Sequence, residues 1–71
     1  MTLKEAVEGI EYKIQNISIS DQELQAFLFS LGCYCGEPIT VIKSRRSGCI
    51  VSIKDGRYSI DAALASAITV G

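Results

Sequence analysis

Hydrophobic and polar residues alternate along several short stretches of the chain. Within residues 10–17, Ile10, Tyr12 and Ile14 alternate with charged or amide side chains, a pattern typical of a half-buried β-strand. Asp55-Gly56 is a typical two-residue hairpin turn, and Ser44 to Gly48 also has the character of a turn. Further strands, rich in β-branched residues or alternating, are predicted at 39–43, 49–54, 57–60 and 68–70.

One segment carries a helical pattern. Ser20 and Glu23 have the spacing of a capping box, and Ile19 before the cap can pack on Leu24 as a hydrophobic staple. Gly32 is suited to end the helix. The apolar stripe at helical spacing consists of Leu24, Phe27, Leu28 and Leu31. We therefore predict a helix over about 21–31, with short helical turns near 3–7 and, behind Asp61, at 62–67.

These elements together favour a small, mainly β (α+β) fold. Five short strands remove their exposed edges best by closing into a barrel, and helix 21–31 would cover one open end. A chain of 71 residues leaves room for one core only, so residues 1–71 are expected to be a single domain.

Charge and composition narrow the functional classes. Seven lysines and arginines against eight acidic residues give a net charge of -1, which disfavours nucleic-acid binding and direct binding to an anionic membrane. Histidine is absent, and neither paired carboxylates nor a glycine-rich phosphate loop is indicated, so we do not expect an enzyme. No apolar run approaches the roughly 20 residues that span a bilayer, and the first ten residues lack a secretory signal. We expect a cytoplasmic protein.

Three cysteines, Cys33, Cys35 and Cys49, leave at least one unpaired, and in a reducing cytosol all are expected to be thiols. Their thiolates could bind zinc, Cu(I) or tetrathiolate iron, with Glu37, water or another chain completing the site. In the simpler interpretation Cys33 and Cys49 are small buried hydrophobes and Cys35 is a loop thiol. We expect no required cofactor, and a transition metal ion remains the open alternative.

Two groups of residues are candidates for binding a partner. Phe29 lies off the apolar stripe of the helix, and with the three tyrosines, Tyr34 in particular, it could line a peptide groove. Otherwise Tyr58 and Phe27 belong to the core and the tyrosines lie at the barrel rim. The other group is the basic patch formed by Lys43, Arg45 and Arg46, which is either a solvated hairpin tip or a contact for an acidic partner face or membrane headgroups.

The sequence resembles the ferrous-iron transport protein A (FeoA) family and the similar domain at the carboxyl end of metal-dependent repressors. The resemblance covers nearly the whole chain, and its motifs are packing and turn positions in a characteristic order. They are Leu3 and Gly9, the Ile14/Ile17 strand, Leu28-x-x-Leu31-Gly32, Gly36, Ile39-x-Val41, Gly56-x-Tyr58-x-Ile60, and Ala65-x-x-Ile68-x-Val70.

The resemblance implies a five-stranded SH3-like barrel and a role as a small accessory or regulatory protein of ferrous-iron uptake. The implied partner is a membrane permease with a cytosolic GTP-binding domain, through which the protein would be peripheral to the membrane at most. Two places depart from the family pattern: Cys35 stands where a proline is usual, and residues 44–49 replace an Ala-Pro-Leu-Gly-Asp-Pro-like loop. Partner specificity carried by that loop therefore does not transfer from the family.

Overall fold

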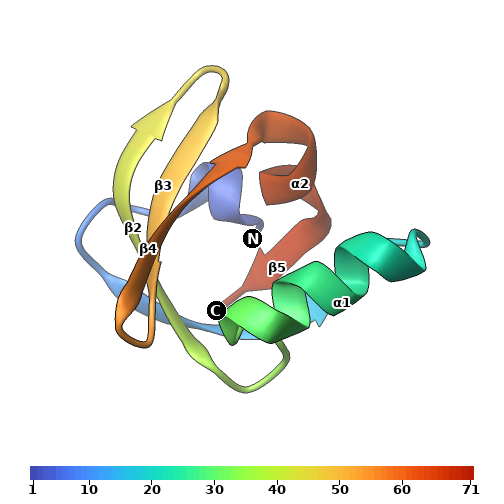
Figure 1. Ribbon diagram of the computed structural model, residues 1–71. Coiled ribbons are helices and arrows are strands. Elements are labelled where there is room, and N and C mark those ends of the chain that lie inside the picture. Colours follow the sequence, from blue (N-terminus) through green and yellow to red (C-terminus); the bar gives the residue numbers. More distant parts are fainter.

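The computed structural model describes all residues, 1–71, as one five-stranded antiparallel sheet with two short α-helices (Figure 1). The sheet order is β4-β3-β2-β1-β5. The elements are η1 (Leu3–Glu5), β1 (Glu11–Ile17), α1 (Gln22–Leu31), β2 (Pro38–Arg45), β3 (Gly48–Ile53), β4 (Gly56–Asp61), α2 (Ala62–Ala67) and β5 (Ile68–Val70). This confirms the predicted small, mainly β fold, an SH3-like barrel with one main helix.

Strand β1 bends the sheet into this barrel. Its first part, Glu11 to Lys13, pairs with β2, and its second part, Ile14 to Ile17, pairs with β5 with a register shift between Ile14 and Asn16. Such an irregularity increases local twist and lets one strand belong to two parts of a curled sheet. No backbone pairing joins β4 to β5, so the predicted closure is incomplete.

The outer side of β5 is already occupied, which explains why β4 does not reach it. The Val70 N–H donates to the Met1 carbonyl oxygen at 2.8 Å, and Thr2 forms a β-bridge with Thr69. Helix α1 lies outside the sheet, near β1 and β4. Side chains of this helix line one pocket with Ile17 of β1 and another with β4.

The core is entirely apolar. No polar or charged residue is buried, and β3 shows the alternation most clearly because every second residue faces inward. The fourteen buried apolar residues are Leu3, Ala6, Ile14, Leu28, Cys33, Ile39, Val41, Cys49, Val51, Ile53, Ile60, Ala65, Ile68 and Val70.

Helix α1 differs from its sequence prediction in two respects. Its N-cap is Asp21 and not Ser20: the Asp21 carboxylate accepts hydrogen bonds from the N–H groups of Glu23 (2.9 Å) and Leu24 (3.2 Å). Of the apolar stripe only Leu28 is buried, whereas Phe27 is 54% exposed. The interpretation of Phe27 as a core residue is therefore wrong, because the narrow barrel buries only the side of α1 that carries Leu28.

The β3–β4 hairpin also lies one residue from the predicted position. Its two-residue loop is Lys54-Asp55, Lys54 carries the positive φ of 53°, and Gly56 already pairs with Ile53 in the ladder. Gly56 does not have a positive φ, and a Cβ there would require the end of the Tyr58 side chain to move. In the β2–β3 hairpin the turn is shorter than the predicted 44–48, because Ser44 and Arg45 belong to β2 and Gly48 begins β3.

Candidate functional site

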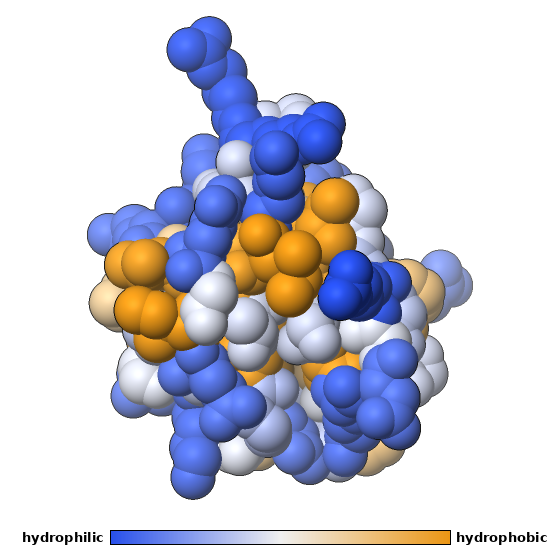
Figure 2. Space-filling view, turned by 90° about the vertical axis from the view of Figure 1, so that its left-hand side faces the viewer, coloured by the Kyte–Doolittle hydropathy of each residue, from blue (hydrophilic) through white to orange (hydrophobic).

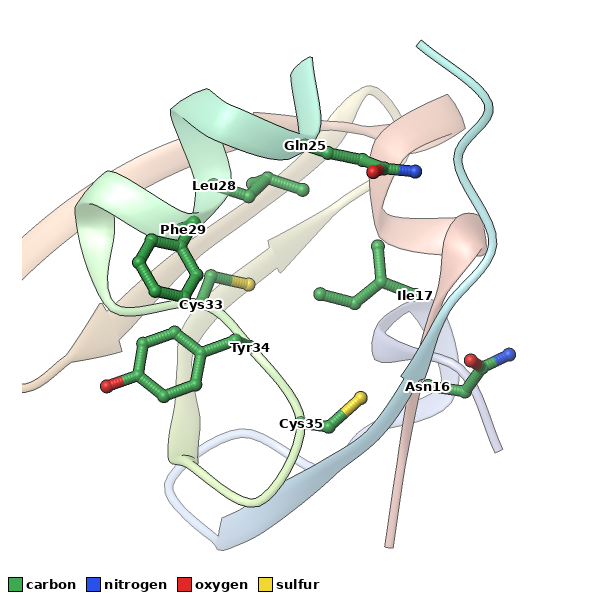
Figure 3. A pocket seen from close by; sticks show the side chains of 8 residues that line it. All are labelled: Asn16, Ile17, Gln25, Leu28, Phe29, Cys33, Tyr34 and Cys35. Atoms are coloured by element: carbon green, nitrogen blue, oxygen red, sulfur yellow. The ribbon is translucent and has the colours of Figure 1, made fainter. Parts of the chain in front are cut away.

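The carboxyl end of α1, the loop that follows it and β1 enclose a pocket of about 240 Å³ (Figure 3). Six of its eight lining residues are hydrophobic. Four residues singled out in the sequence meet here: Phe29, Cys33, Tyr34 and Cys35. The remaining lining residues are Asn16, Ile17, Gln25 and Leu28. We call this the α1-loop pocket.

Two glycines shape the loop beneath this pocket. Gly32 ends α1 with φ +90°, and the Cys33 N–H donates back to the Leu28 carbonyl oxygen at 2.9 Å, the pattern of a glycine C-cap. Gly36 has φ +91°, and its N–H donates to the Ile14 carbonyl oxygen at 2.7 Å. The loop is thus attached to the helix at one end and to β1 at the other, which holds the side chains between them in place.

Phe29 and Tyr34 form an aromatic pair at the rim of the pocket. Their ring centroids are 4.9 Å apart with an interplanar angle of 31°. Phe29 is 66% exposed, the largest exposed fraction among the big apolar side chains. A ring that packs on another ring while most of its surface meets water offers an apolar contact to a second molecule at low entropic cost.

Lys54 from the β3–β4 loop adds charge beside this pair. Its Nζ lies 5.6 Å from the centre of the Tyr34 ring and 3.3 Å from Glu37 Oε1. Hydrogen bonding with Tyr34 and Lys54, together with the Lys54 charge, lowers the pKa of the Glu37 carboxyl. The same partners, Tyr34 first and then Glu37, raise the pKa of Lys54. Lys54 was not among the sequence candidates, since only the fold brings it to Tyr34.

The cysteines are distributed over two places. Cys33 is buried and Cys35 exposed in the α1-loop pocket, and Figure 3 shows both sulfur atoms directed into it. Cys49 is buried on β3, where it pairs with Ser44 and Ile60. Burial, and secondarily Cys35, raises the pKa of the Cys33 thiol to about 11, and burial also raises that of Cys49. No group of three or more histidine, cysteine or acidic side chains converges in a geometry that could hold a metal ion.

The basic candidates are separate from the aromatic ones. Lys43, Arg45 and Arg46 are exposed near the tip of the β2–β3 hairpin, and none of them forms an ion pair. Strand β2 begins next to the α1-loop pocket and runs to this tip, a distance of roughly 20 Å at the usual rise per residue. The five sequence candidates therefore form two surfaces.

The other aromatic side chains do not extend the aromatic pair into one groove. The Tyr12 hydroxyl accepts a hydrogen bond from the Val7 N–H at 3.1 Å, and both Tyr12 and Tyr58 pack against the core. Tyr58 instead shares a second groove with Phe27 of α1. The predicted tyrosine groove thus reduces to Phe29 and Tyr34.

Apolar side chains are exposed on a further face. Val7, Ile10 and Ile42 are between 38% and 55% exposed, and the Gly9 N–H bonds to the Val41 carbonyl oxygen, which holds this loop against β2. Figure 2, which shows the left-hand side of Figure 1, has apolar areas separated by hydrophilic side chains. None of these three residues lines a pocket, so we do not place the site here.

Comparison with known proteins identifies relatives of the whole chain. The FeoA domain family model matches residues 1–71. A crystal structure of an iron uptake regulatory protein (FeoA) is 28% identical, with a TM-score of 0.85 over 99% of this chain and 93% of that one. No curated protein sequence matches significantly. No helix of the structure has the length and apolar character needed to cross a membrane.

Two solution structures share the fold at lower identity. Iron(II) transport protein A from Clostridium thermocellum is 22% identical with a TM-score of 0.86, and the match covers 99% of this chain and 44% of that one. The FeoA protein from Chlorobium tepidum is 19% identical with a TM-score of 0.87, covering 99% and 68%. At these identities the likeness concerns the fold.

Proposed function

The chain belongs to the FeoA domain family, and from this premise we propose that it is a cytoplasmic accessory protein of ferrous-iron uptake. Its partner in this proposal is the cytosolic GTP-binding part of a membrane iron permease. The similar crystal structure is described as an iron uptake regulatory protein, which supports a role beside the transporter. The protein would be peripheral to the membrane through this partner alone.

The observation that carries the proposal is the exposed Phe29–Tyr34 pair at the α1-loop pocket. Apolar aromatic groups beside a small hollow are typical anchor points of protein interfaces. The ion pair of Lys54 and Glu37 lies next to them. Protein interfaces commonly have such a polar rim around an apolar centre. Arg45 and Arg46 of the basic patch lie at the tip of the β2–β3 hairpin, and we call these two residues the basic tip. Their charges can attract an acidic face of the partner during association.

Regulation follows from differential binding. If the protein binds one nucleotide state of the permease more tightly than another, it shifts the permease toward that state by the ratio of the two affinities. No chemistry on a substrate is required of this chain, in keeping with a core without polar groups and with the absence of histidine.

A binding assay with the isolated GTP-binding domain of the permease tests this function. We expect Phe29→Ala and Tyr34→Ala to weaken binding about tenfold or more, the loss typical of an anchor residue. Ser30→Ala, a change on the same exposed turn of α1, is the matched control and should bind normally. Normal binding by both aromatic variants, or no binding by the unaltered protein, would contradict the proposal.

The basic tip is tested separately. Replacement of Arg45 and Arg46 by glutamate should slow association at low salt and have little effect at high salt, because exposed charges act over a Debye length of about 10 Å at 0.1 M. Association that is equally fast at low salt would exclude the basic tip from the interface.

A second candidate function is binding of a soft metal ion by Cys33 and Cys35, which both line the α1-loop pocket. Two thiolates suit Cu(I) better than zinc, which requires about four ligands. The test is metal analysis of protein desalted after anaerobic loading with Cu(I). One ion per chain that is lost in Cys35→Ser and retained in Cys49→Ser would support it, and no retained metal would reject it.

A further inference from the structure

We propose that the outer edge of β4 binds an extended segment of the partner protein as an additional β-strand, with the segment's apolar side chains in a groove between β4 and α1. This inference rests on the proposed function, because the partner is the permease, and it names the shape of the bound segment and a second contact area on this chain.

The free edge of β4 follows from the hairpin register. Gly56 pairs with Ile53 across the two-residue loop, and beyond the other end of the strand the Ala62 N–H donates to the Ser47 carbonyl oxygen at 2.9 Å. Along an antiparallel ladder, hydrogen-bonded residues alternate with residues whose N–H and C=O point the other way. The N–H and C=O groups of Arg57 and Ser59 therefore face away from β3.

Nothing in the structure occupies this edge. β3 is the only neighbour of β4 in the sheet, and the backbone groups of Arg57 and Ser59 appear in no hydrogen bond outside it. The other edge of the sheet differs, since Met1 and Thr2 cover β5. An uncovered edge strand is the usual template for strand addition by a peptide.

The groove beside this edge supplies a place for side chains. It encloses about 340 Å³, and residues 57–61 of β4 form one side of it. Phe27 and Leu31 of α1 and Leu64 of α2 form the other side, and eight of its eleven lining residues are hydrophobic. The ring of Phe27 is 54% exposed, and an apolar side chain of the added strand would cover it.

The charged side chains at the groove indicate which charge the bound segment carries. Arg57 is exposed at the groove and has no ion-pair partner, whereas the Asp61 carboxylate at the other end accepts the Leu64 N–H at 2.8 Å. The groove therefore carries an unpaired positive charge at its Arg57 end and the capping carboxylate of Asp61 at the other end. The matching segment is extended, has apolar residues at alternate positions and carries an acidic residue opposite Arg57.

Amide hydrogen exchange measured by NMR, with the permease GTP-binding domain as the probe, tests the inference directly. In the free protein the amides of Arg57 and Ser59 should exchange fast, while that of Tyr58, bonded to β3, exchanges slowly. In the complex we expect exchange at Arg57 and Ser59 to slow at least tenfold. Unchanged exchange at both in a saturated complex would overturn the inference.

Substitution at Ser59 gives an independent test. Ser59→Pro removes the outward N–H without removing a ladder bond, and proline is tolerated at such edge positions. We expect Ser59→Pro to weaken permease binding at least tenfold and Ser59→Ala, the matched control, to bind normally. If Ser59→Pro does not fold, the exchange measurement on the unaltered protein decides.

The outcomes separate this inference from the proposed function. Binding that is weakened by Phe29→Ala but not by Ser59→Pro would leave the proposed function standing and reject strand addition. Absence of any permease binding would reject both. Protection of the Arg57 and Ser59 amides that grows with protein concentration in the free protein would assign the edge to a second copy of this chain and overturn the partner assignment.

Discussion

The backbone of Gly48 lies directly against the carbonyl oxygen of Ile60 on the neighbouring strand. A Cβ at position 48 would overlap that oxygen and come within 2.8 Å of the Asp61 Cα. Gly48 also has φ +153°, which L-residues rarely adopt. This contact fixes where the β3–β4 ladder meets α2, because Asp61 is both the last residue of β4 and the N-cap of the helix.

Gly48→Ala should therefore destabilise the protein by about 3 kcal/mol, combining backbone strain with steric overlap that only backbone movement can relieve. Gly9→Ala is the comparison: Gly9 has φ +84° but open space around it, so only the cost of the left-handed conformation, about 1 kcal/mol, is expected. Urea unfolding of both variants measures the difference. Equal losses would show that the close approach is relieved without cost.

The N-cap of α1 makes a second prediction. Asp21→Ala removes the acceptor for two backbone N–H groups and should lower the free energy of unfolding by about 1 kcal/mol. Ser20→Ala is expected to change it by less than about 0.5 kcal/mol, because the Ser20 side chain makes no hydrogen bond to the helix. A larger loss for Ser20→Ala would show that Ser20 is the N-cap, as the sequence pattern predicts.

Thiol reactivity should separate the three cysteines. Cys35 is exposed, whereas Cys33 and Cys49 are 1% and 5% exposed with raised pKa values. Because the reactive species is the thiolate, a disulfide reagent at pH 8 should modify one thiol quickly and the other two only after unfolding. Cys35→Ser should abolish the fast phase. Fast reaction of two or three thiols in the unaltered protein would contradict the burial.

Stability should also depend on alkaline pH through Cys33. Its pKa rises from 9.0 to about 11 in the folded protein, so between these values the unfolded chain loses a proton that the folded protein keeps. The contribution of this thiol to the free energy of unfolding is therefore fully present below pH 9 and is lost as the pH rises toward 11. Urea unfolding at several pH values should show a smaller alkaline loss for Cys33→Ala. The two proteins differ only at this position, so the difference between their profiles reports on Cys33; identical pH profiles would contradict the prediction.

Local patterns predicted the elements well and their details less well. Alternation, β-branched residues and turn signals placed all five strands, and the apolar stripe with Gly32 placed α1 within one residue. The cap was misplaced because Ser20 and Asp21 are both good N-caps, and only the backbone geometry selects between them. The β3–β4 loop was misplaced by one residue because Lys54, and not Gly56, adopts the positive φ of the turn.

The candidate site was predicted in part. Phe29 and Tyr34, together with Cys33 and Cys35, follow one another closely in the sequence, so a glycine-capped helix end could bring them together. Lys54 could not be predicted as their neighbour, because it comes from a hairpin that only the curled sheet places beside Tyr34.

The amino-acid sequence alone determines this protein's strands, its main helix and its family, because alternation, capping and glycine positions act over a few neighbouring residues. Which apolar side chains stay exposed, which strand edge remains open and which charges meet the aromatic pair are decided by the tertiary structure. The physical reason is that the bend of β1 and the position of α1 determine which surfaces cover one another. Both the bend and the position depend on contacts between residues far apart in the chain.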